Sequence, residues 1–229
     1  MTYEVREKFY QGHYREASDF PIPNTQYTAL YLDGENHSLN LDKPKQTHVS
    51  HYHSEKDNES LRFTYTFSED TELTGNMNLK LWVSSNEADD MEIFAGIKKL
   101  DRQGNEVNFP DFNHIEQGQV ATGWLRVSHR KLDDEKSTII QPWHKHEQEL
   151  KLKKGEIVPI EIEILPSSTY FKQGETLVVV IKGNEIIKGT SSPGLSTRYE
   201  HHETVNKGHH YIHTGANYDS QLIIPIIPQ

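Results

Sequence analysis

The sequence of 229 residues contains no cysteine. Disulfide bonds, thiolate zinc sites and a thiol nucleophile are therefore excluded. A chain without cysteine suits a reducing compartment, and we predict a cytoplasmic protein. At this length the chain can bury a large core without covalent cross-links.

Long apolar runs are also absent. No window approaches the ~18 consecutive apolar residues of a membrane-spanning helix, and residues 1–20 contain no apolar run typical of a signal peptide. Acidic residues outnumber basic residues, with 34 Asp and Glu against 24 Lys and Arg, and the formal net charge is −10. Since nucleic acids and anionic membranes attract basic surfaces, we expect neither as a partner.

Several catalytic and binding motifs are missing. The nucleophile elbow G-x-S-x-G does not occur, and the nearest similar segment, residues 189–194 (GTSSPG), has the wrong spacing and is interpreted as a loop. Neither a P-loop, H-E-x-x-H nor G-x-G-x-x-G is present. We therefore assign no catalytic residue and no cofactor.

Short segments of alternating apolar and polar residues are the most frequent pattern in the sequence. In residues 61–67 (LRFTYTF) every second side chain is apolar, which is the period of a half-buried strand. The same period recurs in residues 77–83, 158–164 and 222–226. Glycine and proline punctuate these segments, and no long amphipathic helix pattern is found. The sequence therefore predicts an all-β sandwich or barrel.

Two other segments extend this interpretation. Residues 176–181 are a continuous run of β-branched residues and leucine, as expected of a central strand that is covered on both faces. Residues 91–100 fit a strand or a helix equally well. The turn signal in residues 101–105 and the apolar positions of residues 106–109 predict a hairpin that follows them.

The first quarter of the chain is less regular. Residues 1–33 hold short apolar pieces, of which 27–32 (YTALYL) is rich in strand formers. Residues 34–60 are polar with few apolar anchors, and we interpret them as one long loop. We expect residues 1–229 to form a single domain.

Three groups of side chains leave alternatives open. His51 with His53, and His144 with His146, have the i, i+2 spacing of one strand face, and residues 209–213 hold three more histidines. A metal site needs several converging ligands, so surface or structural histidines are preferred and no metal is assigned. The pair at residues 89–90, two aspartates, fits a solvated acidic turn better than a calcium site.

The three tryptophans form the last of these groups. They could build a sugar-binding platform, but burial in the core is the preferred interpretation. Their positions are Trp82, Trp124 and Trp143.

Two blocks are distinctive enough to indicate a family. They are residues 123–133 (GWLRVSHRKLD) and 208–228 (GHHYIHTGANYDSQLIIPIIP). Together with residues 79–85 (LKLWVSS) and 89–94 (DDMEIF), they resemble the C-terminal β-sandwich of the CocE/NonD serine hydrolases, the family that includes cocaine esterase and the X-Pro dipeptidyl-peptidases. Where the family has tryptophan before a proline, this chain has Phe20. The resemblance implies a jelly-roll sandwich like that of galactose-binding domains.

The resemblance also implies a role without catalysis. In that family the catalytic serine, aspartate and histidine lie in an upstream α/β-hydrolase domain, so this chain alone should be inactive. We expect it to pack on such a domain, in cis or as a separate chain, and to help shape its substrate pocket. Residues 1–33 would then be the lead-in from that domain.

Specific residues can be proposed for these contacts. In the loop 34–60, His51 and Tyr52 are candidates for the substrate side. We expect Leu125 and Val127 to face the core, and Arg126 and Ser128 to face outward or into a domain contact. Arg126 and Arg130 are candidates for forked contacts with the neighbouring domain. Gly215 is expected to allow a positive φ at a turn. A face left without its domain could also drive self-association into a homo-oligomer.

An alternative belongs to another functional class. Many independent carbohydrate-binding modules share such a sandwich, and fold does not fix function. That alternative requires exposed aromatic side chains on one sheet face or loop.

Overall fold

The computed structural model describes residues 1–110, 117–186 and 205–228. These ranges contain sixteen strands and one short 3₁₀ helix, η1 (Val127–His129), but no α-helix. The expected all-β fold is therefore confirmed. No helix within the described ranges is long and apolar enough to cross a membrane. Residues 189–194, interpreted above as a loop, lie outside the described residues.

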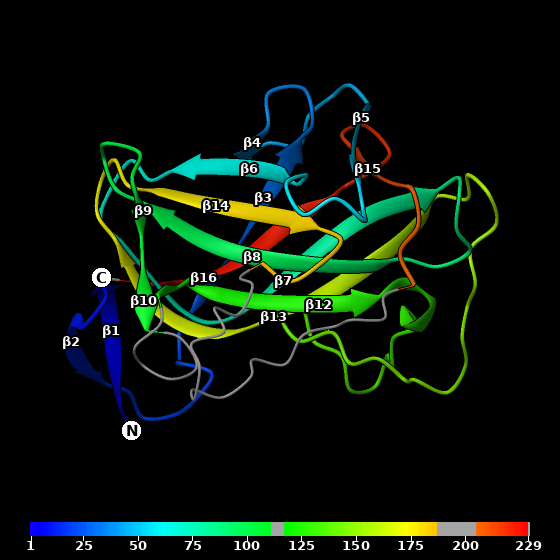
Figure 1. Cartoon of the computed structure of the whole chain (residues 1–229). Coiled ribbons are helices and arrows are strands. Elements are labelled where there is room, and N and C mark those ends of the chain that lie inside the picture. Colours follow the sequence, from blue (N-terminus) through cyan, green and yellow to red (C-terminus); the bar gives the residue numbers. More distant parts are fainter. Residues whose placement is uncertain (111–116, 187–204, 229) are drawn as a thin grey trace, which may run out of the picture.

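Four antiparallel strands form one layer and run side by side across Figure 1. Their order is β12 (Ala121–Arg126), β8 (Glu92–Leu100), β14 (Thr176–Lys182) and β6 (Leu61–Thr66). Strand β14 pairs with both β8 and β6, which confirms it as a central strand. The ambiguous segment 91–100 is a strand because β12 and β14 pair with it on either side.

The predicted hairpin follows β8. Strand β9 (Glu106–Val107) returns antiparallel to β8, and Gly104 supplies the turn with a φ of 83°. A separate two-stranded sheet, β10 (Phe109–Pro110) with β11 (Gln117–Gly118), lies beyond it.

The second layer lies behind the first in Figure 1. Its order is β3 (Gln26–Asp33), β16 (Gln221–Ile227), β7 (Thr71–Ser85), β13 (Val158–Phe171), β1 (Thr2–Lys8) and β2 (Gln11–Glu16). The short strand β4 (Ser38–Asn40) pairs antiparallel with β3 and parallel with β6. The two layers are therefore parts of one sheet that curls over on itself into a sandwich.

Apolar side chains from both layers meet in one core. The predicted inward positions of β7, from Met77 to Val83, are fully buried. Phe67 and Phe171 join the layers, with ring centroids 4.7 Å apart. Burying a large apolar side chain stabilises a fold by about 1.5–3 kcal/mol, so these contacts supply most of the energy that holds the layers together.

The prediction that residues 34–60 are one long loop is wrong. They include β4 and also β5 (His48–His53), which pairs antiparallel with β15 (His209–Thr214). Strand β15 pairs in turn with β7, so β5 is part of the main sheet. The inward side chains of β5 are Ser50 and Tyr52, and their polarity hides the alternation by which a strand is normally found in a sequence.

Residues 1–33 also belong to the sheet. They form β1, β2 and β3, and β1 lies parallel to β13 with Arg6 opposite Thr169. Buried Glu72 of β7 accepts hydrogen bonds from Tyr3 and Arg15, which fastens the β1–β2 hairpin. That these strands lead in from an upstream domain stays a prediction.

Candidate functional site around Asp90 and Arg126

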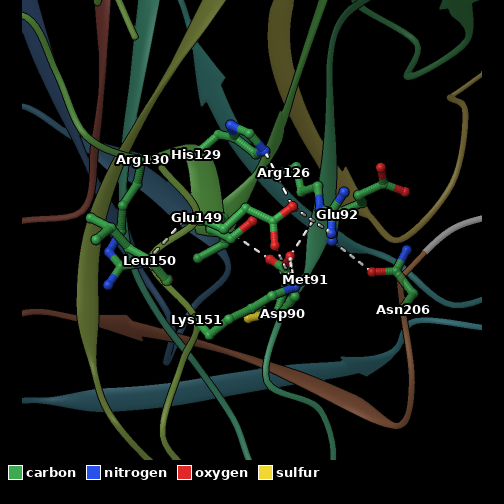
Figure 2. Close-up of polar contacts among 12 residues, drawn as sticks. Asp90, Met91, Glu92, Arg126, His129, Arg130, Glu149, Leu150, Lys151 and Asn206 are labelled. Carbon is green, nitrogen blue, oxygen red and sulfur yellow. Dashed lines mark hydrogen bonds and ion pairs between the residues drawn. The ribbon is translucent and has the colours of Figure 1, made fainter. Parts of the chain in front are cut away.

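A buried carboxylate, Asp90, lies two residues before the start of β8, where three segments meet (Figure 2). Its side chain is in contact with the end of β12, with η1 and with residues 149–152. Asp90 is 1 % exposed. Its Oδ1 accepts hydrogen bonds from the backbone amides of Met91 and Ser128, each at 2.9 Å. Its Oδ2 accepts from Arg126 Nε at 2.8 Å and Lys151 Nζ at 3.1 Å.

The four donors fill the acceptor capacity of the carboxylate, since each oxygen has two lone pairs. Burial is the strongest single influence on Asp90 and would by itself raise its pKa. The hydrogen bonds from Ser128, Arg126 and Lys151 together outweigh burial, so the pKa lies below its usual value. Asp90 is therefore ionised at neutral pH, and it fastens strands instead of holding a ligand. The interpretation as a solvated acidic turn is therefore wrong for Asp90, whereas Asp89 beside it is exposed.

Glu149 extends this cluster toward the surface. It lies 3.5 Å from Arg126 and 3.3 Å from Lys151, and 4.0 Å from Nε2 of His129. Backbone hydrogen bonds from Leu150 to Ser128 and from Leu152 to Asp89, both 2.7 Å, fix the segment beside η1.

The structure gives both predicted inter-domain arginines partners within the chain. Arg126 binds Asp90 and Glu149, with about a third of its side chain exposed. Arg130 donates to the carbonyls of Val127 and Leu150. The two arginines therefore join η1 to the neighbouring segment, and a contact with a further domain stays a prediction.

The inward direction predicted for Leu125 and Val127 is confirmed, because both are buried. The prediction that Ser128 faces outward is wrong, because its side chain is fully buried. The strand ends at Arg126 and turns into η1, so the alternation that would have turned Ser128 outward stops there.

His51 and Tyr52 lie on opposite faces of β5. His51 is exposed, with its ring 5.5 Å from that of His209. Tyr52 is 2 % exposed, and its hydroxyl lies 3.0 Å from Nδ1 of His210 on the opposite strand. Burial raises the pKa of Tyr52 and lowers the pKa of His210 to about 3. The two side chains therefore form a neutral buried pair joined by one hydrogen bond, and His51 alone of the predicted pair reaches the surface.

The structure brings two of the histidine groups together, because the rings of His51 and His53 lie 5.5 and 4.9 Å from that of His209. Among the described residues, no group of three or more histidine and acidic side chains is arranged to hold a metal ion. His213 instead hydrogen-bonds Ser84, with Nε2 and Oγ 2.9 Å apart. Although this is a serine–histidine pair, Ser84 is 5 % exposed and His213 is 7 % exposed, so a carbonyl substrate has no access to it.

The preferred interpretation of the tryptophans is wrong for two of them. Trp124 is 58 % exposed and Trp143 is 57 % exposed, whereas Trp82 is half-buried and donates to Asp219 at 2.7 Å. Trp124 lies on the outer face of β12, where the neighbouring Leu125 faces the core. The alternation of the strand therefore accounts for its exposure.

Each of the two distinctive blocks contains one glycine that allows a close approach between two backbone segments. A Cβ on Gly123 of β12 would overlap the carbonyl oxygen of Glu163 in β13, so this glycine lets the layers approach at the edge of the sandwich. Gly215 has a φ of 72°, as predicted, and lies against the carbonyl of Gln46. The role of Gly123 was missed, although a glycine within a strand pattern signals a close backbone approach.

Comparisons with known proteins identify the family of this chain. Residues 1–223 match the model of the X-Pro dipeptidyl-peptidase C-terminal non-catalytic domain. The chain belongs to this family. The matched range includes residues 34–60, which lie outside the blocks that carry the resemblance.

Individual relatives are longer than this chain. A crystal structure of a CocE/NonD family hydrolase from Staphylococcus aureus superposes with a TM-score of 0.96 at 68 % identity, over 99 % of this chain and 41 % of that one. Cocaine esterase of Rhodococcus sp. (strain MB1 Bresler) is 24 % identical over 213 residues, which are 90 % of this chain and 30 % of the esterase. An aminopeptidase from a marine sediment archaeon, Thaumarchaeota archaeon, shares the fold (TM-score 0.65, 12 % identity, over 98 % of this chain and 40 % of that one). This X-Pro dipeptidyl-peptidase C-terminal domain thus spans less than half of each relative.

Proposed function

We propose that this C-terminal domain packs on an α/β-hydrolase catalytic domain and helps to shape the substrate pocket of that domain. The observation that carries the proposal is the match of residues 1–223 to a non-catalytic domain whose relatives are more than twice as long. The parent reaction would be attack of an activated serine on an ester or amide carbonyl. The lack of G-x-S-x-G in the whole sequence supports a role outside the chemistry.

Within this proposal His51 faces the substrate side, supported by its exposure on β5. The exposed third of Arg126 faces the catalytic domain. A galactose-binding-like jelly roll and a cytoplasmic location, supported by the lack of cysteine, complete the proposal. Where the catalytic domain is missing, its contact face would favour a homo-oligomer.

The test begins with the isolated chain. It should hydrolyse neither p-nitrophenyl esters nor Xaa-Pro p-nitroanilides, and turnover that a serine-directed inhibitor abolishes would contradict the proposal. The chain should bind the α/β-hydrolase portion of the Staphylococcus aureus relative in sedimentation experiments. Arg126→Glu should weaken that binding. If both the binding and the unfolding free energy of this variant are unchanged, Arg126 has no part in the contact.

A second candidate, a carbohydrate-binding module, is favoured by the exposure of Trp124 and Trp143. Aromatic rings on a surface are the platforms on which such modules stack sugars. A glycan array decides between the two: binding that is lost in Trp143→Ala supports the module, and an array without signal supports the hydrolase role.

A further inference from the structure

The histidine pair at residues 144 and 146 acquires a neighbour that the sequence did not reveal. His129, the last residue of η1, lies beside His146, and their Nδ1 atoms are 3.2 Å apart. The ring centroids of these two residues are 5.2 Å apart. One histidine comes from the distinctive block 123–133, and the other comes from the segment that follows it.

The backbone fixes this approach. Lys145 donates its amide to the carbonyl of Lys131 at 2.9 Å, and an isolated bridge joins Leu132 to His144. His146 itself has a φ of 52°, a left-handed conformation that non-glycine residues seldom adopt. The chain therefore holds His146 against η1 in a conformation that costs energy, and such residues cluster at functional positions.

The separation of the two nitrogens fits a shared metal ion. Zinc–imidazole bonds of about 2.0–2.1 Å in a tetrahedral shell place two ligand nitrogens roughly 3.3–3.4 Å apart. On the far side of the His129 ring, Nε2 points toward Glu149 Oε1, 4.0 Å away. A carboxylate beyond the second ring nitrogen is the usual partner of a metal-binding histidine. A third imidazole, His144, has its ring centroid 5.9 Å from that of His146.

We propose that His129 and His146 bind one divalent transition-metal ion through their Nδ1 atoms, with water completing the coordination shell. Imidazole nitrogens favour Zn²⁺, Ni²⁺ and Cu²⁺ over Mg²⁺ and Ca²⁺. The ion would join η1 to residues 144–149 and so reinforce the side of the Asp90 cluster that faces solvent. Glu149 would act as a positioning residue that orients the His129 ring.

The experiment titrates Zn²⁺ into the chain after treatment with EDTA, at pH 7.5, by calorimetry. His146→Ala is the main variant because His146 is exposed, and His129→Ala is the second. His51→Ala is the matched control, because it removes one histidine from the other His-x-His pair. We expect each site variant to lose at least roughly the tenfold affinity that removal of an outer-shell partner costs. The control should bind like the wild type.

A spectroscopic measurement identifies the atoms. Zn²⁺ should shift the Nδ1 resonances of His129 and His146 together in ¹⁵N histidine spectra, and it should raise the Tm of the wild type but not of His146→Ala. Equal Zn²⁺ affinity in the wild type and both site variants would mean an adventitious ion only and would overturn the proposal. Binding that leaves the two Nδ1 resonances in place would also overturn it, since the pair would then be only a hydrogen bond between two imidazoles.

Discussion

The pH dependence of folding should be dominated by one buried side chain, His210. Its ring is fully buried beside Tyr52, and burial lowers the pKa to about 3 from the 6.5 of an exposed histidine. Between these two pKa values His210 is protonated in the unfolded chain and neutral in the folded chain. The contribution of His210 is therefore complete above pH 6.5 and is lost as the pH falls from 6.5 toward 3.

The magnitude follows from the two pKa values. Between pH 7.5 and pH 5 the proton taken up by unfolded His210 costs the folded state about 2 kcal/mol, and at pH 4 about 3 kcal/mol. The Tyr52 hydroxyl, 3.0 Å from Nδ1, can accept from a protonated ring as well as donate to a neutral one, so burial is the source of the effect. Nε2 of His210 finds no hydrogen-bond partner in the described part of the chain, so a charge there would be unsolvated.

The assay compares urea unfolding of the wild type and His210→Gln at pH 7.5 and pH 5. Glutamine offers an oxygen to Tyr52 and takes up no proton, so the variant should lose about 2 kcal/mol less than the wild type over this interval. His51→Gln, on the exposed face of β5, should lose as much as the wild type. An equal loss in His210→Gln and the wild type would refute the reasoning, because His210 would then titrate alike in both states.

Three further substitutions test the packing. Gly123→Ala forces a methyl group onto the carbonyl of Glu163, and it should lower the unfolding free energy in urea by about 1–3 kcal/mol; an unchanged midpoint would show that β12 can move away from β13. Asp90→Asn removes the charge that Arg126 and Lys151 share, and it should cost about 2–3 kcal/mol in the same assay, discounted for the partial exposure of both cations. Lys99→Met strands the carboxylate of Glu175, 2.7 Å from the buried ammonium, and it should cost about 3 kcal/mol, an effect that an added Glu175→Gln should partly reverse.

The sequence predicted the strands whose buried faces are apolar. In the predicted stretches of β6, β7, β13, β14 and β16 the core-facing residues are aliphatic or aromatic, so the pattern is visible without any knowledge of partners. Strand β5 was not predicted because its buried side chains, Ser50 and Tyr52, are polar and lie between histidines. Its pairing with β15, more than 150 residues later in the chain, decides its conformation, and no local pattern records that pairing.

The Asp90 cluster was not predicted for a related reason. Arg126 lies 36 residues after Asp90, and Lys151 lies 61 residues after it. Only the curled sheet brings these side chains together. Charged side chains are usually exposed, which favoured a solvated turn for Asp90 and an outward contact for Arg126. The burial of Asp90 reverses the first interpretation, because an ionised carboxylate in the interior requires donors from its own chain, and Arg126 is one of those donors.

The two distinctive blocks serve the same physical purpose at different edges of the sandwich. Block 123–133 contributes Gly123, which permits the approach to β13, and Arg126, which neutralises Asp90. Block 208–228 contributes His210, which pairs with Tyr52, and Gly215, which fits against residue 46. At each edge, small or hydrogen-bonding residues are needed because backbones or buried polar groups meet there. The most specific parts of this sequence therefore close the curled sheet, and a contact with another domain has to be sought on exposed side chains, such as Trp124 on the outer face of β12 and His51 on β5.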